Sequence, residues 1–109
     1  MITITVLRDK SGNYTGFHTF GHAEFADSGE DIICAAVSML VINTINSMEV
    51  LLQEPFECNS EDENGFIHFR FKELPGKDAV LLMDSMILGL QEVQKQYGKK
   101  YILLKFEEV

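Results

Sequence analysis

Apolar and polar residues alternate with a period of two in several short stretches of this chain. In the first of them Ile2, Ile4 and Val6 alternate with threonines, a pattern typical of a strand with one buried face. Turn residues at 9–13 separate it from the next stretch, which predicts a β-hairpin. The expected strands are residues 2–8, 14–20, 56–60, 66–71 and 101–107.

Two longer stretches repeat their apolar residues every three or four positions, as amphipathic helices do. The first predicted helix runs over 32–53, with Asp31 as its N-cap and Pro55 ending it. The second runs over about 78–97, with Gly98 as its C-cap. The expected core stripes are Val37, Leu40, Val41, Thr44, Ile45, Met48, Leu51 and Leu52, and then Ala79, Leu82, Met83, Met86, Leu90, Val93 and Tyr97.

The first helix is apolar over more than one face. Ile33, Ala36 and Ile42 widen its stripe, so this helix is expected to be either central in the fold or half of a subunit interface.

The predicted order of strands and helices along the chain is ββαββαβ. This order favours an α+β fold, a two-layer sandwich in which two helices pack on one face of a mostly antiparallel five-stranded sheet. A chain of 109 residues fits one domain, residues 1–109.

Composition and charge exclude several classes of function. The formal charge of −8 argues against direct binding to nucleic acid, whose protein partners carry basic patches. We expect no membrane segment, because no run approaches the roughly 18 to 20 apolar residues needed to span a bilayer. The strand-like N-terminus does not resemble a signal peptide, so a cytoplasmic location is expected.

The histidines and cysteines show no spacing typical of a metal site. They lie at His18, His22, Cys34, Cys58 and His68, with neither a C-x-x-C nor an H-x-x-x-H pair. No metal and no cofactor are therefore expected. Two cysteines in a reducing compartment also argue against a disulfide framework.

Cys34 has two interpretations. With Asp31 as N-cap it lies in the first helical turn, where unpaired N–H groups and the helix dipole favour a thiolate nucleophile. The N–H groups of Cys34 and Ala35 are then candidate donors to an oxyanion. Alternatively, Cys34 is the first member of the buried stripe that continues to Val37 and Val41.

His22 is the candidate base for that thiol. It follows Gly21 at the end of a strand, and about a dozen residues of chain allow the imidazole to return to Cys34. Its alternative is an ordinary surface histidine. Asp31 either caps the helix or orients the ring of His22, and the cap is favoured. Ser38 either donates a hydrogen bond near the thiol or bonds back to the helix carbonyl of Cys34.

Two motifs taken together, G-H-A at 21–23 and G-x-D-I-I-C-A-A-V-S at 29–38, closely resemble the ribosomal-processing cysteine protease family. The resemblance implies a homodimeric cytoplasmic endopeptidase that removes a short N-terminal extension from large-subunit ribosomal protein twenty-seven, after a pair of phenylalanines. By motif position His22 matches the catalytic histidine and Cys34 the nucleophile. Gly21, Asp31 and Ser38 match supporting positions.

The substrate so implied agrees with the chemistry of the chain. A basic ribosomal protein suits an acidic enzyme, and a Phe-Phe sequence needs an apolar cleft, to which Phe20 and Phe25 are expected to contribute. The alternative function is a non-catalytic assembly factor that binds a ribosomal protein, with Cys34 in its core. A third hypothesis, a redox sensor, requires Cys58 to act as the resolving cysteine.

Overall fold

The computed structural model describes residues 1–21, 28–61 and 65–109, with the backbone alone described at 28–31. The elements follow the predicted order ββαββαβ. They are β1 (Ile2–Arg8), β2 (Tyr14–Phe20), α1 (Ser28–Val50), β3 (Phe56–Glu61), β4 (Phe66–Phe71), α2 (Lys77–Tyr97) and β5 (Ile102–Glu108). Strand boundaries agree with the sequence prediction to within one residue.

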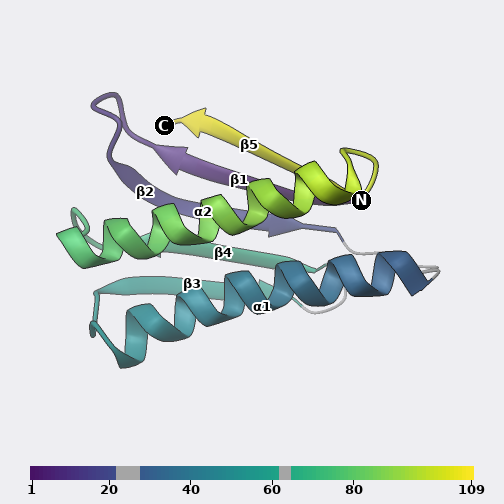
Figure 1. The fold of residues 1–109 in the computed structure, drawn as a ribbon. Coiled ribbons are helices and arrows are strands. Elements are labelled where there is room, and N and C mark those ends of the chain that lie inside the picture. Colours follow the sequence, from purple (N-terminus) through teal and green to yellow (C-terminus); the bar gives the residue numbers. More distant parts are fainter. Residues whose placement is uncertain (22–27, 62–64) are drawn as a thin grey trace.

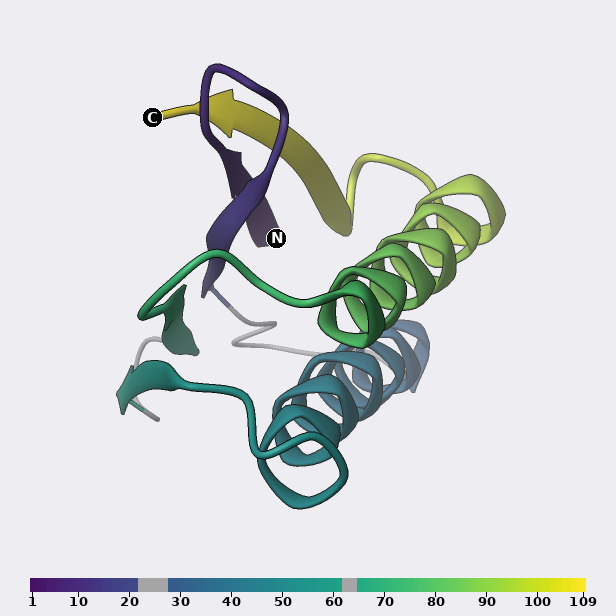
Figure 2. The ribbon, with the colours of Figure 1, turned by 90° about the vertical axis from the view of Figure 1, so that its left-hand side faces the viewer.

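The five strands form one sheet in the order β3-β4-β2-β1-β5. All neighbours are antiparallel except β1 and β5, which run parallel in a register that pairs Ile2 with Ile102. Both helices lie on the same face of the sheet (Figure 1), and the view along the layers shows the other face without a helix (Figure 2). The predicted two-layer α+β sandwich is confirmed.

Phe69 on β4 is at the centre of an aromatic cluster between the sheet and the helices. Its ring centroid lies 5.0 Å from that of Phe17, 4.8 Å from that of Phe56 and 4.9 Å from that of Phe71. These strands therefore present a continuous apolar surface to α1 and α2, since alternate residues of paired strands share a face. From α1 the residues Ile33, Val37, Val41, Thr44 and Met48 are buried against it.

The start of α1 differs from the prediction. The helix begins at Ser28, four residues before the expected start, so Asp31 lies inside its first turn and is not the N-cap. At the other end Gln53 adopts a left-handed conformation (φ 53°), and the Glu54 N–H donates to the carbonyl of Met48, 2.9 Å away. The left-handed residue and this hydrogen bond close the end of the helix before Pro55, as helix C-caps commonly do.

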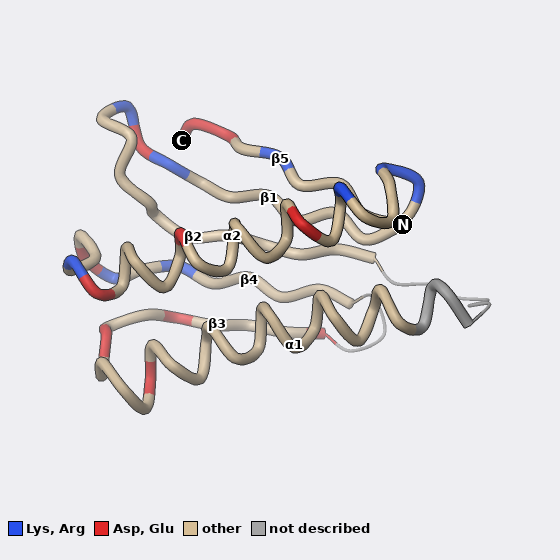
Figure 3. The backbone as a smooth tube through the Cα atoms, in the orientation of Figure 1, with Lys and Arg blue, Asp and Glu red and all other residues tan. Residues whose placement is uncertain are grey.

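The helix α1 is more apolar than expected from the sequence analysis, which found no run long enough to span a bilayer. Residues 32–50 are long and apolar enough, by length and composition, to cross a membrane, a property shared by core helices of globular proteins. The same segment buries Ile33, Val41 and Met48 in the core. It has no charged residue between Asp31 and Glu49, and the corresponding part of α1 is tan in Figure 3.

The second helix packs beside α1 and confirms most of its predicted stripe. Gly89 permits the close approach, because a Cβ at this position would lie 2.8 Å from Cδ2 of Leu40 on α1. The predicted cap at Gly98 is confirmed, with its N–H donating to the carbonyl of Gln94. Two details differ: Ile87 joins the core, and Tyr97 is exposed.

Gly16→Ala is expected to lower the free energy of unfolding by about 2–3 kcal/mol, as overpacking of a close contact does. A Cβ at residue 16 would collide with the carbonyl oxygen of Phe69 and lie 3.0 Å from Cα of Arg70, both backbone atoms of β4. Urea denaturation followed by circular dichroism measures the change. In Gly76→Ala, where a Cβ meets nothing within 4 Å, we expect a change within about 0.5 kcal/mol. Equal stability of the two variants would contradict the close β2–β4 approach.

Candidate active site

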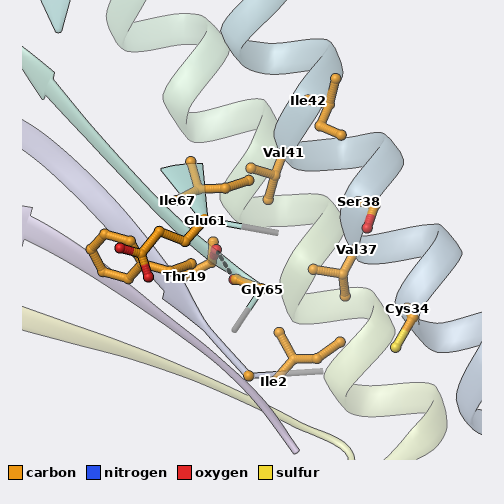
Figure 4. A pocket seen from close by; sticks show the side chains of 12 residues that line it. Ile2, Thr19, Cys34, Val37, Ser38, Val41, Ile42, Glu61, Gly65 and Ile67 are labelled. Carbon is orange, nitrogen blue, oxygen red and sulfur yellow. Dashed lines mark hydrogen bonds between the residues drawn. The ribbon is translucent and has the colours of Figure 1, made fainter. Parts of the chain in front are cut away.

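A cavity of about 200 Å³ opens between the first half of α1 and the adjacent ends of the strands (Figure 4). Its walls are mostly apolar, and they come from segments that are far apart in the sequence. The helix contributes Cys34, Val37, Ser38, Val41 and Ile42. The sheet and its connections contribute Ile2, Thr19, Gly21, Glu61, Gly65, Phe66 and Ile67.

Cys34 lies on the wall of this cavity rather than in the core. Its side chain is half-buried beside the core residues, and its thiol is free. Ser38 and Val37 line the cavity from the following turn, because residues three and four apart share a helix face. The thiol therefore has both an apolar environment and access to a ligand in the cavity. A cysteine that only fills the core needs no such access.

The early start of α1 changes the surroundings predicted for Cys34. It is the seventh residue of the helix, not a member of the first turn. Only the first four N–H groups of a helix lack a carbonyl partner within it. The amides of Cys34 and Ala35 belong to the hydrogen-bonded part, so their assignment as oxyanion donors is wrong for this conformation.

Gly21, the residue before His22, lines the same cavity as Cys34. It follows β2 directly, lines the cavity and has a left-handed φ of 91°. A Cβ at this position would collide with the carbonyl oxygen of Met1, so only glycine fits without movement of the backbone. His22 itself lies outside the described residues, as does Phe25. What the structure shows here is that Gly21, the residue before His22, shares a cavity with Cys34.

A hydrogen bond holds the sheet side of the cavity together. The Thr19 hydroxyl donates to the carbonyl of Gly65, 3.1 Å away, and so links the end of β2 to the start of β4 (Figure 4). Sequence reasoning missed this wall, because the strand register that aligns Thr19 with Ile67 is a long-range property. Glu61 supplies a carboxylate, and no Lys or Arg is among the described lining residues.

The predicted contribution of Phe20 to the cleft is wrong. Phe20 pairs with Thr3 and is 58% exposed, and the cavity takes its aromatic ring from Phe66 instead. No cluster of three or more residues able to hold a metal ion occurs in the part of the chain that the structure describes.

Comparison with known proteins gives a consistent result. The model of the family described as cysteine protease Prp matches residues 1–102. The ribosomal processing cysteine protease Prp of Bacillus subtilis is 33% identical over 102 residues, covering 89% of this chain and 90% of the relative. The protein of the same name from Staphylococcus aureus is 28% identical over 99 residues, covering 91% of this chain and 93% of the relative.

Solved structures of the Staphylococcus aureus protease have the same fold. The crystal structure in complex with a substrate peptide superposes with a TM-score of 0.89 at 27% identity, covering 98% of this chain and 100% of the other. The complex with a covalently linked product peptide gives a TM-score of 0.87 at 28% identity and the same coverage. A cysteine peptidase activity accounts for the free thiol on the cavity wall. The chain belongs to the cysteine protease Prp family.

Proposed function

We propose that this cysteine peptidase removes the N-terminal extension of large-subunit ribosomal protein twenty-seven through a dyad of Cys34 and His22. The observation that carries the proposal is the half-buried, free thiol of Cys34 on an apolar cavity whose lining also includes Gly21, the residue before His22. The relatives from Bacillus subtilis and Staphylococcus aureus are named ribosomal processing cysteine proteases, which supports a ribosomal protein as substrate. A cytoplasmic location, where thiols stay reduced, is part of the proposal.

The chemical steps follow from these two groups. His22 accepts the thiol proton, and the thiolate of Cys34 attacks the scissile carbonyl carbon to form a tetrahedral oxyanion. The C–N bond then breaks as protonated His22 gives its proton to the leaving amine, and a thioester remains on Cys34. Water adds to the thioester with His22 as base, which releases the carboxyl product and restores the thiol.

The cavity supports a preference for an apolar side chain next to the scissile bond. Val37, Val41 and Ile67 are among the apolar residues that line the cavity with Cys34, and a phenylalanine side chain is stabilised by removal of its apolar area from water. The net charge of −8 favours encounter with a basic ribosomal protein. These two features together support the substrate that the family resemblance implies.

The exposed side of α1 supports a homodimer as a second part of the proposal. Ile32, Met39 and Ile42 are 56%, 70% and 48% exposed on a helix without charged residues between Asp31 and Glu49. Solvent-facing helix surfaces normally carry charge, and contiguous apolar patches mark interaction sites. A second copy of the chain, related by a twofold axis, covers such a patch with the same patch.

Cys34→Ala is expected to abolish cleavage and to leave the fold intact, because the substitution removes only the nucleophile. His22→Ala is expected to lose most of the rate, at least 100-fold, since general acid–base catalysis contributes about 10²–10⁴-fold. The substrate is the extended ribosomal protein, and product masses are measured by mass spectrometry. Full activity of Cys34→Ala would overturn the mechanism.

The reactivity of the native thiol separates a nucleophile from a core cysteine. We expect iodoacetamide to alkylate native Cys34 rapidly, whereas a cysteine buried in the core reacts slowly.

Gly21→Ala tests whether the chain leaving β2 positions His22. The substitution strains a left-handed residue and collides with the Met1 carbonyl, so we expect at least a tenfold loss of kcat/KM. Gly98→Ala is the matched control, because Gly98 also has a left-handed φ (92°) but its Cβ would meet nothing within 4 Å. That variant is expected to keep its activity. Equal activity of both variants would contradict a positioning role for Gly21.

Met39→Glu is expected to convert the dimer to a monomer, because it introduces a charge into the proposed apolar interface of α1. Sedimentation velocity measures the oligomeric state. The control is Leu74→Glu, which adds the same charge at a similarly exposed leucine outside the helices (69% against 70% exposed). A wild-type monomer at micromolar concentration, or a dimer in both variants, would exclude this interface.

A further inference from the structure

The face of the sheet that the helices leave open carries a row of polar side chains across all five strands. Strand register sets Thr5 opposite His18, His18 opposite His68, and His68 opposite Asn59. Lys105 on β5 is paired with Thr5 and completes the row. These residues alternate with core residues such as Ile4 and Phe17, so they belong to the face away from the helices (Figure 2).

The two histidines in this row are direct cross-strand neighbours. Their ring centroids lie 5.9 Å apart with an interplanar angle of 79°, and both side chains are half-buried. A metal ion held at about 2.0–2.1 Å from one nitrogen of each ring keeps two such centroids roughly 5 to 6 Å apart. The observed separation of His18 and His68 therefore matches that of two imidazoles on one ion, to within a small side-chain rotation.

The surroundings keep the pair available for binding. Next to His18, the Thr5 hydroxyl is fully buried and has no hydrogen-bond partner among the described residues. A bound ion with a water in its shell gives this orphan hydroxyl the partner that buried polar groups require.

We propose that His18 and His68 bind one divalent transition-metal ion of the kind that prefers imidazole nitrogen, such as Zn²⁺ or Cu²⁺. Two protein ligands leave the remaining positions to water, so the site is open and exchanges its ion with solvent. The ion links β2 to β4, the same two strands that the Thr19–Gly65 hydrogen bond joins at the cavity. The proposal does not depend on the protease assignment, because these residues lie on the opposite face of the sheet.

The test measures Zn²⁺ binding by isothermal titration calorimetry in the variant Cys34→Ser/Cys58→Ser, because free thiols also bind this ion. One equivalent is expected to bind. His18→Gln and His68→Gln are each expected to lower the affinity at least tenfold, and the double substitution to lower it little further, since two ligands of one ion act as a unit. The control His22→Gln removes the third histidine of the chain and is expected to leave the affinity unchanged.

Small, additive losses from the two substitutions would overturn the proposal, since they indicate two separate surface imidazoles. Unchanged affinity in either variant would overturn it as well. Pulsed electron paramagnetic resonance of bound Cu²⁺ gives an answer that does not depend on the folding of a histidine variant. The measurement uses the variant without cysteines. Two coordinated imidazoles per ion support the shared site, and one or none excludes it.

Discussion

The burial of one face of α1 against the sheet is the constraint on which the rest of the structure depends. Ile33, Val37 and Val41 fix the rotation of the helix, because each is almost completely removed from water in the common hydrophobic core. Cys34 follows Ile33 by one position and therefore lies at the boundary between the buried and exposed sides. The same packing that forms the core thus brings the thiol to the cavity wall. Cys34 therefore lies beside core residues, as one interpretation predicted, and on the cavity, as the other requires.

The local pattern of the sequence predicted the elements well because their periods are properties of short segments. Alternation placed every strand, and the glycine at residue 98 marked the end of α2 correctly. The start of α1 was predicted four residues late, since Asp31 before an apolar run looks like a cap although Ser28 begins the helix. Tyr97 shows the opposite limit: its spacing fits the buried stripe, but at the end of α2 its side chain is exposed.

The candidate site was only half predictable, for a physical reason. Cys34 and Gly21 could be found from motif and position, whereas the walls at Thr19, Gly65 and Ile67 depend on how β2 and β4 pair. Strand alternation also decides the orientation of Phe20, which lies three positions after Phe17 in β2 and so faces away from the helices. Pairing between distant segments therefore determines which apolar side chains meet a substrate.

The position of Cys34 two turns inside α1 changes which group must activate the thiol. The helix dipole acts mainly within the first turn, so a thiolate at the seventh residue gains less from it than the predicted position implied. In the proposed mechanism the role of His22 as base becomes correspondingly larger. The oxyanion also needs a donor other than the helix amides. Of the hydroxyl groups on the described cavity lining, that of Ser38 lies one turn from Cys34, whereas that of Thr19 already donates to Gly65.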